Sequence, residues 1–123
     1  MKKQISFSTL GNTYIHEMRD KINNSENKID LDHFFSQTVT NFLNKVFHDQ
    51  DFVIDNGDII FNPDSENYFS VSDDLWKLEY FKEIWNSSDL PNVIKKFADS
   101  TYHRYLHLNK HPEKTQKKIR KHA

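Results

Sequence analysis

Three histidines near the C-terminal end of the chain have a spacing that metal sites use. His103, His107 and His111 lie four residues apart, so on a helix each neighbouring pair shares one face and can grip a divalent ion. The first and the third would be about 12 Å apart along the axis, because a helix rises about 1.5 Å per residue, and they cannot hold the same ion. We therefore predict a polar helix face here, with no metal and no cofactor.

Acidic residues dominate a segment in the middle of the chain, where residues 46–76 hold eight acids and no lysine or arginine. A calcium loop of the EF-hand kind needs acids at alternate positions and a glutamate at its end, and the spacing here does not meet that pattern. Each acid could serve a turn or a helix start, but the missing counter-charges favour a surface for a basic partner. The predicted partner-binding residues are Trp76 and the eight acids Asp49, Asp51, Asp55, Asp58, Asp64, Glu66, Asp73 and Asp74.

The C-terminal end of the chain carries the opposite charge. Residues 104–123 contain seven bases and one acid, Glu113. Lysine and arginine neutralise phosphates, and Tyr102 and Tyr105 could stack on bases, so a nucleic-acid-associated regulator is the alternative function. The net charge of −1 is not that of a general nucleic-acid binder, and the simpler interpretation of this segment is a solubilising tail.

Composition limits the class of protein. A chain of 123 residues fits one domain, and ten phenylalanines compensate for an apolar content of 36%, which predicts a phenylalanine-rich core. The absence of cysteine excludes disulfides and thiolate metal sites, and two glycines are too few for a phosphate-binding glycine loop. No apolar run is long enough for a signal peptide or a membrane span, so we expect a cytoplasmic protein that does not enter a membrane.

Two helices are expected in the N-terminal part of the chain. The first is predicted over 12–23, capped by Asn12 or Thr13, because apolar residues recur every four positions. The second is predicted over 31–48, with Asp30 as its N-cap. Its apolar residues alternate at spacings of three and four and form one continuous stripe, namely Leu31, Phe34, Phe35, Val39, Phe42, Leu43 and Val46.

The apolar period then changes to two, which is the period of a strand. Residues 51–55 and 58–61 flank Asn56-Gly57, a dipeptide typical of a two-residue hairpin turn in which both residues have positive φ. Pairing across that turn would place Ile54 opposite Ile59. A further strand is expected over 68–71, which would complete a small antiparallel meander.

A third helix is predicted over 73–85, because Ser72 is suited to cap it and two aspartates follow in its first turn. Trp76 and Trp85 lie nine residues apart, so on one continuous helix their rings would point to opposite sides. One of the two rings would then need cover from a second layer or from a partner.

The last helix is predicted from Asp89 to Leu108, with Pro91 tolerated in its first turn. Pro112 would stop it, and the polar, basic residues beyond offer no apolar face that could dock. We therefore expect a single α+β domain over 1–111 and a basic, mobile tail over 112–123.

The order of elements predicts about four helices packed on a small two- or three-stranded antiparallel sheet, arranged helix, helix, hairpin, helix, helix. No nucleophile and base pair, metal set or cofactor loop stands out, so we expect no enzymatic activity. In general character the chain is similar to bacterial immunity and inhibitor proteins. The predicted function is a protein-binding module whose acidic hairpin region binds a basic partner such as a nuclease toxin.

Overall fold

Five helices and a two-stranded antiparallel sheet make up the part of the chain that the computed structural model describes, residues 6–110. This confirms the predicted α+β class of helices packed on a small sheet. In chain order the elements are α1 (Ser8–Asn23), α2 (Lys28–Val46), β1 (Ile59–Phe61), β2 (Phe69–Val71), α3 (Asp73–Trp76), α4 (Glu79–Ser87) and α5 (Leu90–Lys110).

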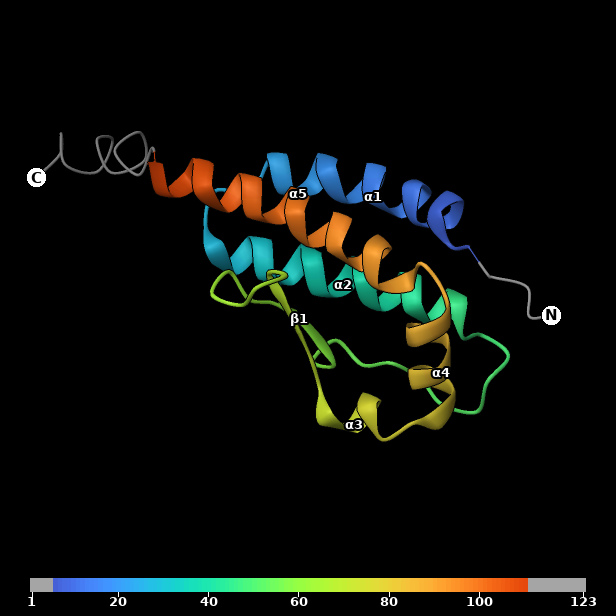
Figure 1. Cartoon of the computed structure of the whole chain (residues 1–123). Helices are drawn as coiled ribbons and strands as arrows, with labels where there is room; N and C mark the ends of the chain where they lie inside the picture. The colour runs from blue at the N-terminus through green and yellow to red at the C-terminus, as the bar shows by residue number, and fades with distance from the viewer. Residues whose placement is uncertain (1–5, 111–123) are drawn as a thin grey trace, which may run out of the picture.

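The three long helices form one unit, in which α1, α2 and α5 each contact the other two. Figure 1 shows α1 and α5 side by side with α2 next to them. The strand pair β1–β2, α3 and α4 lie on the side of α2 and α5 that faces away from α1. Strand β1 packs against α2, so α2 has structure on both sides. The predicted phenylalanine-rich core is confirmed, because five phenylalanines are among the largest fully buried side chains: Phe35, Phe42, Phe47, Phe81 and Phe97.

The first two helices begin earlier than the sequence pattern predicted. Helix α1 starts at Ser8, and Asn12 and Thr13 are exposed residues inside it, so neither is the cap. Helix α2 starts at Lys28 and is capped by Asn27, whose side chain accepts the Asp30 N–H at 2.9 Å. The predicted cap at Asp30 is therefore wrong, and its carboxylate instead lies in the first turn, where the helix dipole favours it.

The predicted hairpin across Asn56-Gly57 is wrong. Strand β1 pairs with β2, in the register Ile59 opposite Val71 and Phe61 opposite Phe69, and residues 51–55 belong to no strand. Neither glycine has a positive φ, so the turn at 55–58, closed by the bond from Asp58 N–H to the Asp55 carbonyl at 2.9 Å, is not the predicted type. The strand expected over 68–71 is confirmed as β2, and it takes the place that residues 51–55 were predicted to fill.

The predicted helix over 73–85 is interrupted at Leu78, whose backbone is extended (φ −84, ψ 114). Ser72 does cap α3, since its hydroxyl accepts the Leu75 N–H at 3.3 Å. The break changes the direction of the chain between the two tryptophans, and their ring centroids lie 5.6 Å apart at an interplanar angle of 90°. The expectation that Trp76 and Trp85 point to opposite sides is therefore wrong, because it assumed one continuous helix.

Helices α1 and α5 run parallel, and a single carboxylate lies beside both of their N-terminal ends. Asp89 precedes α5, and its side chain accepts the Phe7 N–H at 2.7 Å and the hydroxyls of Ser6 and Ser8 at 2.8 Å each. Burial raises the pKa of the Asp89 carboxyl, but these hydrogen bonds outweigh burial and the pKa is lowered. The carboxylate thus supplies the cap that α1 lacks, since its N-cap residue Phe7 makes no side-chain cap bond.

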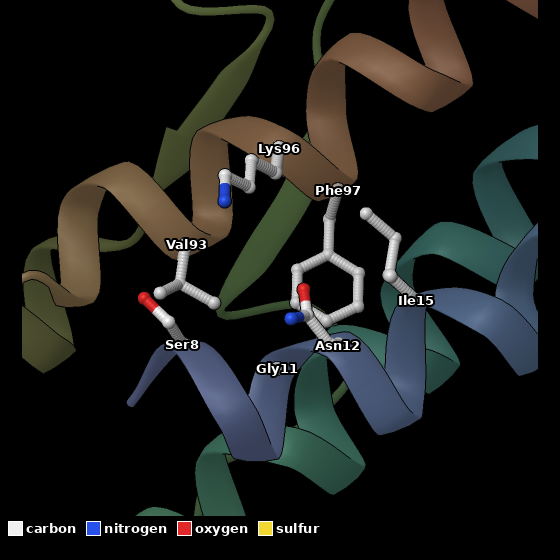
Figure 2. Close-up of a pocket in the computed structure, with 7 residues that line it drawn as sticks. All are labelled: Ser8, Gly11, Asn12, Ile15, Val93, Lys96 and Phe97. Atoms are coloured by element: carbon white, nitrogen blue, oxygen red, sulfur yellow. The ribbon is translucent and has the colours of Figure 1, made fainter. Parts of the chain in front are cut away.

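Farther along the same pair of helices, Gly11 of α1 lies directly against Val93 of α5 (Figure 2). An added Cβ at Gly11 would overlap Cγ1 of Val93 and would also touch a ring carbon of Phe42. The two helices therefore approach closely only because residue 11 has no side chain. The space lined by Gly11, Ile15, Val93 and Phe97 is filled by these side chains.

The two glycines should respond oppositely to the same substitution. Gly11→Ala is expected to lower the free energy of unfolding by about 1–3 kcal/mol, because Val93 is β-branched and has no free rotamer to retreat into. Gly57→Ala is expected to be neutral or stabilising by up to roughly 1 kcal/mol, since nothing lies within 4 Å of the added carbon. Urea unfolding of both variants measures the two changes. A large loss of stability in Gly57→Ala would indicate that Gly57 has a positive φ, as the predicted hairpin turn requires and the structure does not show.

Asp89 should make stability depend on pH in the acid range. A carboxyl whose folded pKa lies below its unfolded value of about 3.9 stabilises the fold fully above that value and loses the contribution as pH falls through the folded pKa. Asp89→Ala should therefore lower the free energy of unfolding at pH 7 by about 1–3 kcal/mol. It should also make the decrease of stability between pH 5 and pH 3 smaller than in wild type. Thermal midpoints measured from pH 7 to pH 3 give both effects. If the midpoints of wild type and Asp89→Ala fell in parallel with pH, the Asp89 carboxylate would not be the source of the pH dependence.

Candidate functional site

The structure separates the predicted acidic residues into three places. Asp55, Asp58, Asp73 and Asp74 lie together where β1 begins and β2 ends, because the Ser72 N–H bonds to the Asp58 carbonyl at 2.7 Å. Asp49 and Asp51 lie on the segment between α2 and this turn. The remaining two, Asp64 and Glu66, lie in the connection between β1 and β2, at the opposite end of the strand pair.

The segment 51–55 is held by a side chain of α2. Asn44 accepts the Ile54 N–H through Oδ1 at 2.8 Å and donates through Nδ2 to the Ile54 carbonyl at 2.9 Å. The amide thus occupies both backbone groups that a neighbouring strand would use, which explains why Ile54 is buried and yet unpaired in any sheet. Burial alternates along this segment, in which Asp51, Val53 and Asp55 are all exposed.

Val53 is the most unusual member of this segment, because 74% of its surface is exposed. Ile54 enters the core beside it, and Asp51 and Asp55, each two residues from Val53, are exposed as well. No hydrogen bond or ion pair ties the carboxylates of these two aspartates to other described residues. An apolar side chain flanked by two free carboxylates is therefore presented to solvent. We name Asp51, Val53 and Asp55 the 51–55 ridge.

Asp58 has a structural role that sets it apart from the other acids. Its carboxylate accepts the Asp55 N–H at 2.9 Å and the Ser72 hydroxyl at 2.8 Å, and it is half-buried. Ser72 in turn caps α3. Asp58 therefore fixes the start of α3 against the 55–58 turn, and it is not free to meet a partner.

The other acids of the segment are exposed and almost without counter-charge. In the described part of the chain, the one base that forms an ion pair with any of them is Lys77, whose ammonium lies 3.9 Å from the Asp74 carboxylate with both side chains largely in solvent. Asp73 and Asp74 also occupy the first turn of α3, where the dipole stabilises them modestly. Trp76, predicted as part of the same surface, is half-buried against Phe81 and Trp85 and is chiefly a packing residue.

Three residues on which the nucleic-acid alternative rests, Tyr102, Arg104 and Tyr105, make contacts within the fold. Tyr102 stacks on Tyr68 with ring centroids 3.8 Å apart and an interplanar angle of 4°, and its ring also packs on Tyr105. The Arg104 guanidinium donates to the Ser25 carbonyl at 2.9 Å, which ties α5 to the connection between α1 and α2. The bases beyond Lys110, and His111, lie outside the described residues.

Within residues 6–110, no group of three or more histidine, cysteine or acidic side chains comes together in a way that could hold a metal ion. His103 instead lines a polar groove between α1 and α5 with His16, Arg19 and Lys96. Sequence reasoning missed this groove, because its two sides are some eighty residues apart in the chain. The signal was the helical spacing of His16 and Arg19 on one element and of Lys96, Ser100 and His103 on the other.

Comparisons with known proteins leave the function to be argued from this geometry alone. No protein-family model, curated protein or solved structure shows significant similarity to the chain. None of the helices in residues 6–110 combines the length and the apolar character that crossing a membrane requires.

Removing the Asn44 amide tests how the 51–55 ridge is held. Asn44→Ala leaves the N–H and the carbonyl of buried Ile54 without partners, which should lower the free energy of unfolding by about 2–4 kcal/mol. Asn41→Ala, an exposed position on the same helix, is the control and should change stability by less than about 0.5 kcal/mol. Denaturant midpoints give both values, and equal midpoints for the two variants would mean that water replaces the amide.

Proposed function

We propose that this protein is a non-enzymatic protein-binding module of the inhibitor or immunity kind, which binds a basic partner through the 51–55 ridge. The observation that carries the proposal is the exposed Val53 flanked by the unpaired carboxylates of Asp51 and Asp55. Asp73 and Asp74 extend the negative charge along the start of α3, next to Asp55.

This combination suits protein recognition for two separate physical reasons. Exposed charge of one sign steers a partner of the opposite sign and raises the association rate, an effect that salt weakens. A central apolar side chain surrounded by polar groups then limits dissociation, because its burial removes apolar surface from water. A basic nuclease, whose active-site cleft is cationic, is the kind of partner whose site an acidic ridge could occupy.

The hairpin provides a charge-matched control for this proposal. The variant Asp51→Asn/Asp55→Asn removes two charges from the ridge, and Asp64→Asn/Glu66→Gln removes two charges from the opposite end of the strand pair. All four side chains are exposed, so both variants should keep the wild-type stability within about 0.5 kcal/mol. Asp58 is left unchanged, because its carboxylate holds the start of α3.

The partner is first captured on the immobilised full chain at low salt from an extract of the source cells, and its binding is then measured with purified proteins. The ridge variant should associate roughly three- to tenfold more slowly than wild type, and the control variant within about twofold of it. Raising the salt concentration should remove most of the difference. Equal association rates for the ridge and control variants would show that charge at the ridge is not used.

The apolar part of the ridge is tested separately. Val53→Thr keeps the shape of the side chain and replaces a methyl group by a hydroxyl, so it should raise the dissociation rate roughly three- to tenfold with little change in association. Because Val53 is exposed, the melting temperature should not change. Two results together would replace this proposal by the alternative of a nucleic-acid regulator. The first is an unchanged dissociation rate for Val53→Thr. The second is the loss of the protein's biological activity when five basic residues are neutralised, namely Lys114, Lys117, Lys118, Arg120 and Lys121.

A further inference from the structure

A polar groove runs between α1 and α5, the two helices that Figure 1 shows side by side. It has a volume of about 470 Å³. His16 and Arg19 line it from α1, one helical turn apart, and Lys96, Ser100 and His103 line it from α5 at spacings of four and three residues. The parallel packing of the two helices therefore aligns two polar stripes into one depression.

The groove is cationic in the described part of the chain. Arg19 reaches across it, and its Nε donates to the Ser100 hydroxyl at 3.2 Å, which positions the guanidinium and leaves its two terminal nitrogens free of other described residues. Neither Arg19 nor Lys96 has a carboxylate within ion-pair distance among residues 6–110. The one acid in the lining, Asp99, is already paired with Lys95 at 3.0 Å.

We propose that this groove binds a phosphate group. The free edge of a guanidinium matches the oxygens of a phosphate in a fork of two hydrogen bonds. The Lys96 ammonium adds a second, mobile charge on the opposite wall. His16 and His103 each supply at least one ring N–H donor in either protonation state. These four side chains line the groove from two helices, with Lys96 and His103 on either side of Ser100 along α5, so the phosphate is expected beside the guanidinium that Ser100 holds.

The types of residue that line the groove indicate which part of the ligand is recognised. Among residues 6–110, no aromatic ring other than the two imidazoles lines the groove, and Ile15 is the only large apolar residue in the lining, so these residues offer a nucleobase no extended stacking platform. The ligand is therefore recognised by its phosphate, which belongs either to a small polyphosphate or to the backbone of a nucleic acid. This site is independent of the 51–55 ridge and does not rest on the function proposed for it.

Titration of the full, isotope-labelled chain by NMR tests the groove with two probes, pyrophosphate and a short single-stranded thymidine oligonucleotide. Backbone amides of α1 and α5 around Arg19 and Ser100 should shift on addition of at least one probe. The variant Arg19→Gln/Lys96→Gln should raise the dissociation constant at least about tenfold, since it removes two charged contacts. Lys21→Gln/Lys45→Gln changes the net charge equally at exposed positions outside the groove and should stay within about twofold of wild type.

Each result decides between definite outcomes. Binding of pyrophosphate alone assigns the groove to small phosphorylated ligands, and binding of the oligonucleotide, with or without pyrophosphate, assigns it to a nucleic-acid backbone. Equal affinities of the groove and control variants overturn the proposal, as does the absence of shifts in α1 and α5 with both probes. A second variant, His103→Asn, should also weaken binding, and the ridge variant Asp51→Asn/Asp55→Asn should not, which keeps the two proposals separable.

Discussion

The arrangement of the long helices depends on the Asp89 carboxylate, whose negative charge lies beside the positive N-terminal ends of α1 and α5. Parallel neighbouring helices bring two positive N-terminal ends together, and the N-cap residue of α1, Phe7, has no side chain that could cap the helix. One carboxylate accepts a hydrogen bond from Phe7 and two from Ser6 and Ser8, and it belongs to the residue that immediately precedes α5. The register of α1 against α5 follows from this point, and with it the close contact at Gly11 and the alignment of the polar groove.

The features that the sequence predicted correctly are those that neighbouring residues decide. Five residues of the apolar stripe of α2 are buried as its spacing requires, and Phe34 and Val46 are partly buried: the five are Leu31, Phe35, Val39, Phe42 and Leu43. Ser72 caps α3 and Pro91 lies in the first turn of α5, because a cap and a missing N–H act within one helical turn. The exposure of most acids in residues 46–76 also follows from their local character.

Apart from the starts of α1 and α2 and the break at Leu78, which are local, the features that the sequence missed depend on partners outside their own segment. Asn56-Gly57 favours a hairpin locally, but Asn44 satisfies the backbone of Ile54 from α2 and β2 takes the place beside β1. The Asp89 tether joins residues more than eighty positions apart, and so do the walls of the groove. A pattern within one segment contains no information on such pairs. For the same reason, only some of the predicted partner-binding residues lie together, because Asp64 and Glu66 are at the opposite end of the strand pair from the other acids.

The break at Leu78 gives the protein a spectroscopic property. Because α3 and α4 are separate helices, Trp76 and Trp85 meet edge to face with centroids 5.6 Å apart at 90°, close enough for their excited states to couple. Two coupled indoles produce a paired positive and negative band in the far-ultraviolet circular dichroism spectrum, whose size depends on their mutual angle. The band pair therefore reports the angle between α3 and α4, beside the 55–58 turn, without any added label.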